Sequence, residues 1–227
     1  MNSPSPQPIS LPFSDKYDHR HAQAYFHKHR DGLARRLSHL RDEQLARHAL
    51  RLADDPTLVL DLPCGAGRFW PVLAEQPNRV IIGADNSADM LAVARSKHPA
   101  SLLRRVSPLK TSAFDIDLPD RAVDCVFCMR LLHHIGDAEH RLAMLREFRR
   151  VTRDTAIVSL WVDGNYKAWR RARLERERGA RGEQNRYVIP VQTAEREFRE
   201  AGFDILGHAD FLPRYAMWRV YTLRRSA

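Results

Sequence analysis

Long apolar runs, a secretory signal and a disulfide framework are all missing from this 227-residue chain. No stretch reaches the roughly 18 apolar residues that a membrane-spanning helix needs. The first residues also lack the basic segment followed by an apolar one that marks a secretory signal. The three cysteines, Cys64, Cys125 and Cys128, are an odd number in such a chain, which argues against disulfides. We therefore expect reduced thiols, a cytoplasmic location and no membrane insertion.

The chain also lacks a convincing metal-binding pattern. Cys125 and Cys128 have the spacing of a metal pair, but they fall in an apolar strand, where residues three apart point to opposite faces. Six of the eleven histidines lie before residue 50, but they do not repeat on one helical face with an acidic partner. We interpret them as a solvated helical surface, so the sequence predicts no metal site.

Positive charge is in excess, with 37 Lys and Arg against 28 Asp and Glu, a formal net charge of +9. This excess fits an anionic partner such as nucleic acid, a phosphorylated sugar or a lipid head group. It equally fits an arginine-rich soluble surface. Part of the excess is concentrated in residues 164–190, which contain few apolar residues.

Three regions follow one another along the chain. Residues 1–14 contain four prolines and four serines and are expected to be a flexible lead-in. Apolar residues then recur at helical spacing over residues 15–53, with Gly32 as a break between two helices. Residues 54–227 form the main domain, which carries the basic insertion at 164–190.

Short apolar runs alternate with amphipathic stretches in the main domain, which is typical of a parallel sheet with helices on both faces. The expected strands are 58–60, 80–82, 102–103, 123–128, 155–160, 203–206 and 218–223. Helices are expected from 88 to 97, over about 138–151 and over about 193–201. The pattern predicts an α/β fold with a seven-stranded, mostly parallel sheet.

A glycine-rich turn follows the first of these strands, from Asp61 to Gly67. Glycines at a strand-to-helix junction let the backbone approach a ligand, although such turns also contain glycine for geometric reasons alone. Trp70 stands where a dinucleotide fingerprint needs its third glycine, which disfavours a pyrophosphate. The carboxylate of Asp61 favours a ligand with a positive charge. Asp85, at the end of the second strand, can accept both hydroxyls of a ribose, or alternatively cap the next helix.

Three segments together resemble the class I S-adenosylmethionine-dependent methyltransferases: 60–67, 83–87, and 112–114 ahead of 118–124. The resemblance spans about residues 55–223 and is closest to the small-molecule branch that includes ubiquinone and menaquinone biosynthesis methyltransferases. It implies a Rossmann-like sheet with an antiparallel last strand, and an N-terminal helical lid at 15–53.

The resemblance also implies S-adenosylmethionine as the cofactor. It places Asp61 near the methionine amino group, Gly65 to Gly67 along the methionine and ribose, and Asp85 on the ribose hydroxyls. The full expected set is Asp61, Pro63, Cys64, Gly65, Ala66, Gly67, Asp85, Asn86, Ser112, Ala113, Phe114, Met129 and Arg130. Two positions depart from the family pattern: Pro63 replaces the first glycine, and Ser112 replaces the usual acidic residue near the adenine. Asp115 is an alternative adenine partner.

Catalysis is expected after the fourth strand, because ligands in this fold sit at the carboxyl ends of the strands. His134, and less strongly His133, are the candidate bases there, although the family often carries a histidine that only packs in this turn. The segment lacks the motif of amino-directed DNA methyltransferases. Cys64 lies on the wrong strand end for a nucleophile, so we expect it to contribute backbone.

The methyl acceptor is expected to be a small anionic molecule, since Lys167 to Arg186 contains eight basic residues against three acidic ones. Candidate acceptor contacts are Tyr17, Tyr25, Arg30, Arg170 and Arg173. A solvated helix is the alternative interpretation of the insertion. O-methylation is favoured, with C-methylation next. An RNA methyltransferase and a non-catalytic S-adenosylmethionine-binding regulatory protein remain alternatives, and the oligomeric state is open.

Overall fold

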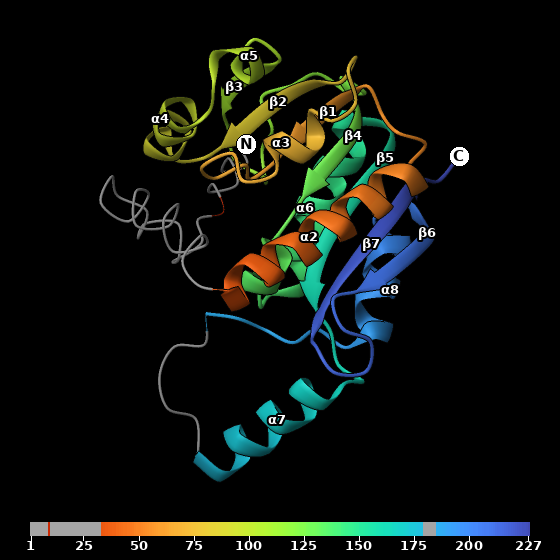
Figure 1. The fold of residues 1–227 in the computed structure, drawn as a ribbon. Helices are drawn as coiled ribbons and strands as arrows, with labels where there is room; N and C mark the ends of the chain where they lie inside the picture. Colours follow the sequence, from red (N-terminus) through yellow and green to blue (C-terminus); the bar gives the residue numbers. More distant parts are fainter. Residues whose placement is uncertain (1–8, 10–32, 179–184) are drawn as a thin grey trace.

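The computed structural model of the chain describes residue 9 and residues 33–178 and 185–227 (Figure 1). Apart from Ile9, the expected flexible lead-in at 1–14 lies outside the described residues. The first part of the expected helical lid lies outside them as well, and with it Tyr17, Tyr25 and Arg30.

One seven-stranded sheet forms the centre of the molecule, in the order β3-β2-β1-β4-β5-β7-β6. The strands are β1 (Leu58–Asp61), β2 (Val80–Asp85), β3 (Val106–Lys110), β4 (Val123–Cys128), β5 (Thr152–Trp161), β6 (Phe203–Asp210) and β7 (Trp218–Arg225). Neighbours among β1 to β5 pair in parallel, and β7 is antiparallel to both β5 and β6. The predicted mostly parallel sheet with an antiparallel last strand is confirmed.

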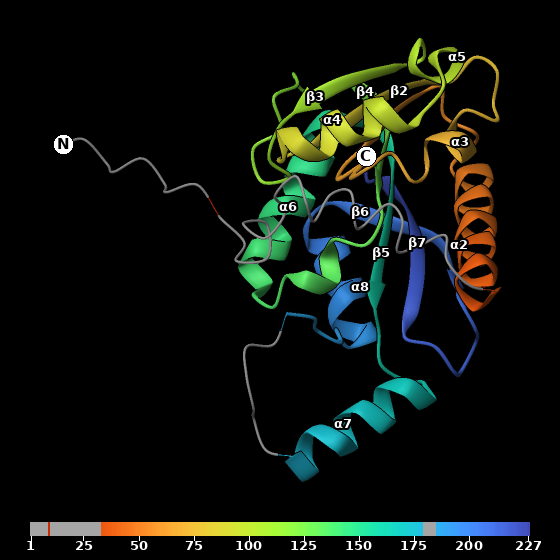
Figure 2. The same ribbon diagram turned by 60° about the vertical axis from the view of Figure 1, so that its left-hand side comes forward.

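Helices cover both faces of this sheet (Figures 1 and 2). The helices are α2 (Leu33–Leu52), α3 (Trp70–Leu73), α4 (Ala88–Lys97), α5 (Ala100–Leu103), α6 (Ala138–Val151), α7 (Tyr166–Arg178) and α8 (Val191–Glu200), with the 3-10 turn η2 (Leu132–His134). Buried residues of α2, α3 and α4 form one hydrophobic cluster with the sheet. Residues of α6 and α8 form a second cluster. None of the described helices is long and apolar enough to cross a membrane.

The central strand β4 is apolar except for Asp124, because both of its faces are covered. It lies between β1 and β5 with both faces covered, so Cys125 packs in one cluster and Cys128 in the other. Both thiols are buried and free, as is Cys64. Among the described residues no group of three or more metal-ligating side chains comes together.

The third strand lies later in the chain than the sequence predicted. Leu102 and Leu103 belong to helix α5, and the strand follows at Val106–Lys110. Because β3 is the edge strand, its side chains are largely exposed and it accommodates Pro108, so it gives little apolar signal. The apolar pair instead packs from α5 against the cluster around Trp70.

Helix α7 stands away from the sheet in both views (Figures 1 and 2). It begins just after the carboxyl end of β5 and carries the basic residues of the expected insertion. The protein therefore places a separate, arginine-rich helix at the edge of the sheet where the parallel strands end.

Candidate active site

Two carboxylates meet at the carboxyl ends of neighbouring strands. Asp61 ends β1 and Asp85 ends β2, and these strands pair in parallel with Asp61 opposite Gly83. Both side chains are buried, with exposed fractions of 1% and 5%. The Oδ2 atom of Asp61 has no hydrogen-bond partner in the part of the chain that the structure describes.

Asp85 organises the turn by binding the backbone. Its Oδ2 accepts from the N–H of Gly65 and its Oδ1 from the N–H of Ser87, both at 2.9 Å. The cap of helix α4 is Ser87, whose hydroxyl accepts from the N–H of Met90 at 3.3 Å. Each carboxylate oxygen of Asp85 keeps acceptor capacity for a further hydroxyl.

Burial shifts the titration of both carboxylates. It raises the pKa of Asp61 well above its usual range, and the negative charge of Asp85 raises it further. Burial also raises the pKa of Asp85, against the backbone N–H groups of Ser87 and Gly65. A cation beside Asp61 would compensate the desolvation of its charged form.

Open space lies next to these carboxylates. Gly65 has a φ of +54°, and a Cβ atom there would meet no atom within 4 Å. Gly67, at φ +72°, is crowded, because its Cβ would lie 2.6 Å from the ring of Trp70. The indole of Trp70 also contacts Gly83 from β2. The turn thus leaves room at Gly65 and is packed tightly at Gly67.

Pro63 and Cys64 contribute backbone to the same turn. The Leu62–Pro63 peptide is cis, and the N–H of Cys64 donates to the carbonyl of Ala84 at 2.7 Å. Burial raises the pKa of the Cys64 thiol well above its usual value. A buried, protonated thiol fits the expectation that Cys64 is not a nucleophile.

The turn after β3 begins beside Asp85, because the N–H of Thr111 donates to the Asp85 carbonyl at 3.1 Å. Ser112 lies in this turn, where its hydroxyl accepts from the N–H of Phe114 at 3.1 Å. Asn86 and Asp115 are exposed and Ala113 is buried. These expected adenine contacts therefore lie in the turns next to Asp85.

Sequence reasoning missed Asp42, a residue of α2 that connects three parts of the site. Its buried carboxylate accepts from Arg68 at 2.6 Å and also from Arg130. Arg68 belongs to the turn after β1, and Arg130 follows β4, next to the buried Met129. The backbone of Arg130 is left-handed, with φ +68°, and its N–H donates to the Ser159 hydroxyl at 2.8 Å.

The two histidines have different surroundings. His133 is buried, with ring centroids 5.1 Å from Trp161 and 4.6 Å from Trp218. Burial lowers its pKa to about 2, helped by the positive charges nearby. His134 is half-buried, and its Nδ1 lies 2.7 Å from the carbonyl of Asn185. If Nδ1 donates to that carbonyl, the lone pair resides on Nε2.

Basic side chains surround the two tryptophans beside these histidines. The guanidinium groups of Arg171 and Arg186 lie 5.3 and 5.6 Å from the Trp161 ring. Arg130 lies 4.7 Å from the ring of Trp218. These arginines and tryptophans are far apart in the sequence. No local motif predicts that Arg186 or either tryptophan lies beside the two histidines.

Arg170 and Arg173, the two arginines of the insertion that were predicted to contact the acceptor, lie on other parts of α7 than Arg171. Arg170 is exposed, and Arg173 lies 6.0 Å from the ring of Trp169. A groove of about 790 Å³ runs along the helix, starting at Asp163 just after β5. Its walls include the aromatic and basic side chains Tyr166, Trp169, Arg171, Tyr187 and Arg214.

Known proteins resemble this chain in both sequence and fold. Residues 59–155 match a family model described as a methyltransferase domain. Demethylmenaquinone methyltransferase of Thermus thermophilus is 36% identical over 118 residues, which cover 51% of this chain and 53% of that protein. The tRNA (carboxymethyluridine(34)-5-O)-methyltransferase ALKBH8 of Macaca fascicularis is 24% identical over 180 residues, 77% of this chain and 26% of that protein.

The matched part spans from about a quarter to about half of these relatives. Among solved structures, magnesium protoporphyrin IX methyltransferase from Synechocystis PCC 6803 with bound SAH superposes with a TM-score of 0.75 at 18% identity. The superposition covers 94% of this chain and 98% of the other. The methyltransferase domain, the sheet order and the paired carboxylates agree with the expected family. Residues 59–155 are therefore similar to a methyltransferase domain, and the chain shares its fold with solved methyltransferases, as the resemblance to the class I S-adenosylmethionine-dependent enzymes led us to expect.

Proposed function

We propose that this chain transfers a methyl group from S-adenosylmethionine to a small anionic acceptor. The observation that carries the proposal is the pair Asp61 and Asp85 at neighbouring strand ends in a methyltransferase domain. The buried carboxylate of Asp61, whose Oδ2 has no hydrogen-bond partner among the described residues, suits the ammonium group of the cofactor, and Asp85 suits its ribose hydroxyls. When bound, the cofactor supplies an electrophilic methyl group.

The rest of the cofactor site follows from the neighbouring turns. The open side of Gly65 gives the ligand access to the backbone. Ser112 and Asn86, which follow β3 and β2, are the residues that we expect to contact the adenine. Asp42 fixes Arg68 and Arg130, and so positions the turns after β1 and β4 relative to each other.

His134 is the residue we assign to proton removal from the acceptor. Burial lowers its pKa, so the ring is neutral near physiological pH and can accept a proton. His133 is a much weaker base, because its pKa is about 2. A hydroxyl acceptor needs such a base, which supports O-methylation ahead of C-methylation.

The acceptor is anionic in this proposal because Arg171 and Arg186 lie against Trp161 at the carboxyl edge of the sheet. Arg171 also pairs with the exposed Glu175 at 2.7 Å, and an anionic acceptor would compete with that carboxylate. The groove along α7 continues from there with aromatic walls. A carboxylate or phosphate on a flat ring system would bind the guanidinium forks and stack on the aromatic side chains.

A screen of hydroxylated aromatic acids and their neutral methyl esters tests this function, with formation of S-adenosylhomocysteine as the readout. We expect turnover with the acids and not with the esters. Arg171→Gln should raise the KM for an accepted acid about tenfold, while the matched variant Arg170→Gln leaves it unchanged. His134→Gln should lower kcat. Equal turnover of acids and esters would contradict the anionic acceptor, and cofactor binding without any turnover would favour a non-catalytic protein.

An RNA acceptor is the second candidate. It is favoured by the similarity to a protein named as a tRNA methyltransferase and by the net charge of +9. RNA binding through phosphates weakens steeply as salt increases. A titration with bulk tRNA at several salt concentrations therefore decides this candidate, and affinity that is absent or insensitive to salt excludes it.

A further inference from the structure

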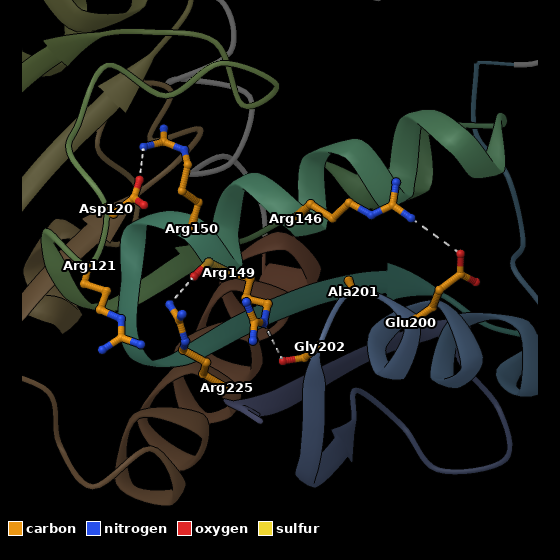
Figure 3. A pocket seen from close by; sticks show the side chains of 9 residues that line it. All are labelled: Asp120, Arg121, Arg146, Arg149, Arg150, Glu200, Ala201, Gly202 and Arg225. Carbon is orange, nitrogen blue, oxygen red and sulfur yellow. Dashed lines mark hydrogen bonds and ion pairs between the residues drawn. The ribbon is translucent and has the colours of Figure 1, made fainter. Parts of the chain in front are cut away.

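A second pocket lies at the opposite edge of the sheet from the carboxylate pair (Figure 3). Arg121 precedes the start of β4, and Arg225 ends the antiparallel strand β7 beside the start of β5. The last turn of α6 contributes Arg149, and Gly202 follows the end of α8. The cavity holds about 360 Å³ and is lined by five arginines but only two acidic residues.

Two of the five arginines are neutralised by acidic side chains. Arg150 pairs with Asp120 at 3.1 Å and also with Glu147 at 2.8 Å. Arg146 pairs with Glu200 at 3.6 Å. Figure 3 shows the Arg150–Asp120 pair and the Arg146–Glu200 pair on opposite sides of the pocket.

The other three arginines have no ion pair with any described residue. Arg149 donates from Nε to the carbonyl of Gly202 at 3.2 Å. Arg225 donates from Nη1 to the carbonyls of Arg149 and Thr152, at 2.8 and 3.2 Å. The side chain of Arg121 is exposed and forms no hydrogen bond with the described residues. Carbonyl bonds hold two of the guanidinium groups in place without neutralising them.

Ordinary helix capping accounts for only part of this arrangement. Arginines commonly bind the last carbonyls of helices, which explains the contacts of Arg149 and Arg225. A Cβ atom at Gly202 would lie 2.3 Å from the Nε of Arg149, so glycine permits this close approach. Arg121 caps nothing, although its backbone is held in the pocket wall by a 2.8 Å bond from its N–H to the Arg150 carbonyl.

The three guanidinium groups repel one another. Burial lowers the pKa of Arg225, and the positive charges of Arg121 and Arg149 lower it further. An anion between them would relieve this repulsion. A phosphate group offers three acceptor oxygens and a charge near −2, which matches three guanidinium forks better than one carboxylate does.

We propose that Arg121, Arg149 and Arg225 bind the phosphate group of a small ligand, at a site separate from the cofactor site. The cavity volume is near the lower end of the about 300–1,000 Å³ found for small-molecule sites. Asp120 and Glu200 flank the pocket and are already paired with Arg150 and Arg146, which leaves a small group of three guanidinium groups between them for an anion. A small phosphorylated molecule or free phosphate therefore fits better than a nucleic acid.

Calorimetric titration of the full chain with ribose 5-phosphate and with inorganic phosphate, at constant ionic strength, tests this site. We expect saturable binding of at least one of them. Arg121→Asn should weaken it about tenfold or more, because asparagine tolerates the left-handed backbone at this position, where φ is +54°. Arg104→Gln removes an equally exposed arginine outside the pocket and should leave binding unchanged.

The two probes distinguish the source of the phosphate. Tighter binding of ribose 5-phosphate supports a phosphorylated metabolite, and equal binding supports the free ion. Neither probe should bind less tightly when S-adenosylmethionine is present. The proposal is overturned if neither probe binds, if Arg121→Asn binds as tightly as the wild type, or if only a short single-stranded RNA binds. If the variant does not fold, thermal melts of the wild type test the site instead: both probes leaving the melting temperature unchanged would overturn the proposal.

Discussion

The carboxylate of Asp85 accepts a hydrogen bond from the N–H of Gly65, 20 residues earlier in the chain, at 2.9 Å. This bond links the end of β2 to the turn after β1, so the backbone of that turn and its acidic partner form one unit. Asp61 lies beside this unit with one carboxylate oxygen unpartnered among the described residues. These contacts, and the side chains that support them, determine how the protein should respond to substitution.

Asp61→Asn should stabilise the protein without cofactor and weaken its response to cofactor. The folded-state pKa of Asp61 is raised, so its stabilising contribution exists at low pH and is lost as the pH rises through that pKa. Removing the charge at pH 7 should increase stability by about 1 kcal/mol or more, or roughly 2–4 °C. Thermal melts with and without S-adenosylmethionine measure both effects. A lower melting temperature for the unliganded variant would contradict this account, and Asp89→Asn is the control.

Gly65→Ala should weaken cofactor binding far more than it weakens folding. Gly164 is the matched control, because it also has positive φ and no atom within 4 Å of an added Cβ. Each alanine should cost about 1–2 kcal/mol of stability for the left-handed backbone. Only Gly65→Ala should lower cofactor affinity, by tenfold or more, since its Cβ would occupy the ligand space. Equal affinities of the two variants would show that this space is not used.

Local sequence was enough to locate the two carboxylates and the glycine-rich turn. Asp61 and Asp85 each end an apolar strand, and Gly65 follows the first of these strands. Parallel strands bring their carboxyl ends to one edge, so short motifs predicted that the two carboxylates lie together. Asp42 was not predictable in the same way. Its partner Arg130 is 88 residues away, and a single acidic residue on a polar helix carries no signal of a distant contact.

The surroundings of the proposed acceptor were harder to predict for the same reason. Charge density singled out the insertion as a basic element, but it does not tell which of its arginines lie against aromatic side chains. Successive residues of a helix point in different directions, so Arg171 lies against Trp161 while its neighbour Arg170 is exposed. The third strand was misplaced because an exposed edge strand with a proline has little apolar periodicity.

Stability should fall on acidification below about pH 6.5 because of His133. Its folded-state pKa is about 2, so the unfolded chain binds a proton there that the folded chain does not. The free energy of unfolding should decrease by about 1 kcal/mol between pH 6 and pH 5 from this residue alone. Urea unfolding at several pH values measures the slope. His133→Gln should flatten it and the exposed His48→Gln should not; an unchanged slope in His133→Gln would contradict the burial argument.

Asp42→Asn should destabilise the protein by about 3 kcal/mol, because Arg68 and Arg130 lose their shared carboxylate in a buried place. The neighbouring Glu43 is the control. It pairs with Arg47 on the more exposed side of α2, so Glu43→Gln should cost less than about 1 kcal/mol. Denaturant unfolding compares the two variants. Similar losses would show that Asp42 does not connect α2 to the turns after β1 and β4.

Calorimetric titration of S-adenosylmethionine into the wild type and into Asp85→Ala tests the central claim most directly. The wild type should bind one cofactor per chain. The variant should lose on the order of 2 kcal/mol of binding free energy, roughly thirtyfold in affinity. Asp89→Ala, which changes an exposed residue in the first turn of α4, should bind as the wild type does. Binding to Asp85→Ala with unchanged affinity, or no binding to the wild type, would contradict the assignment of this edge as the cofactor site.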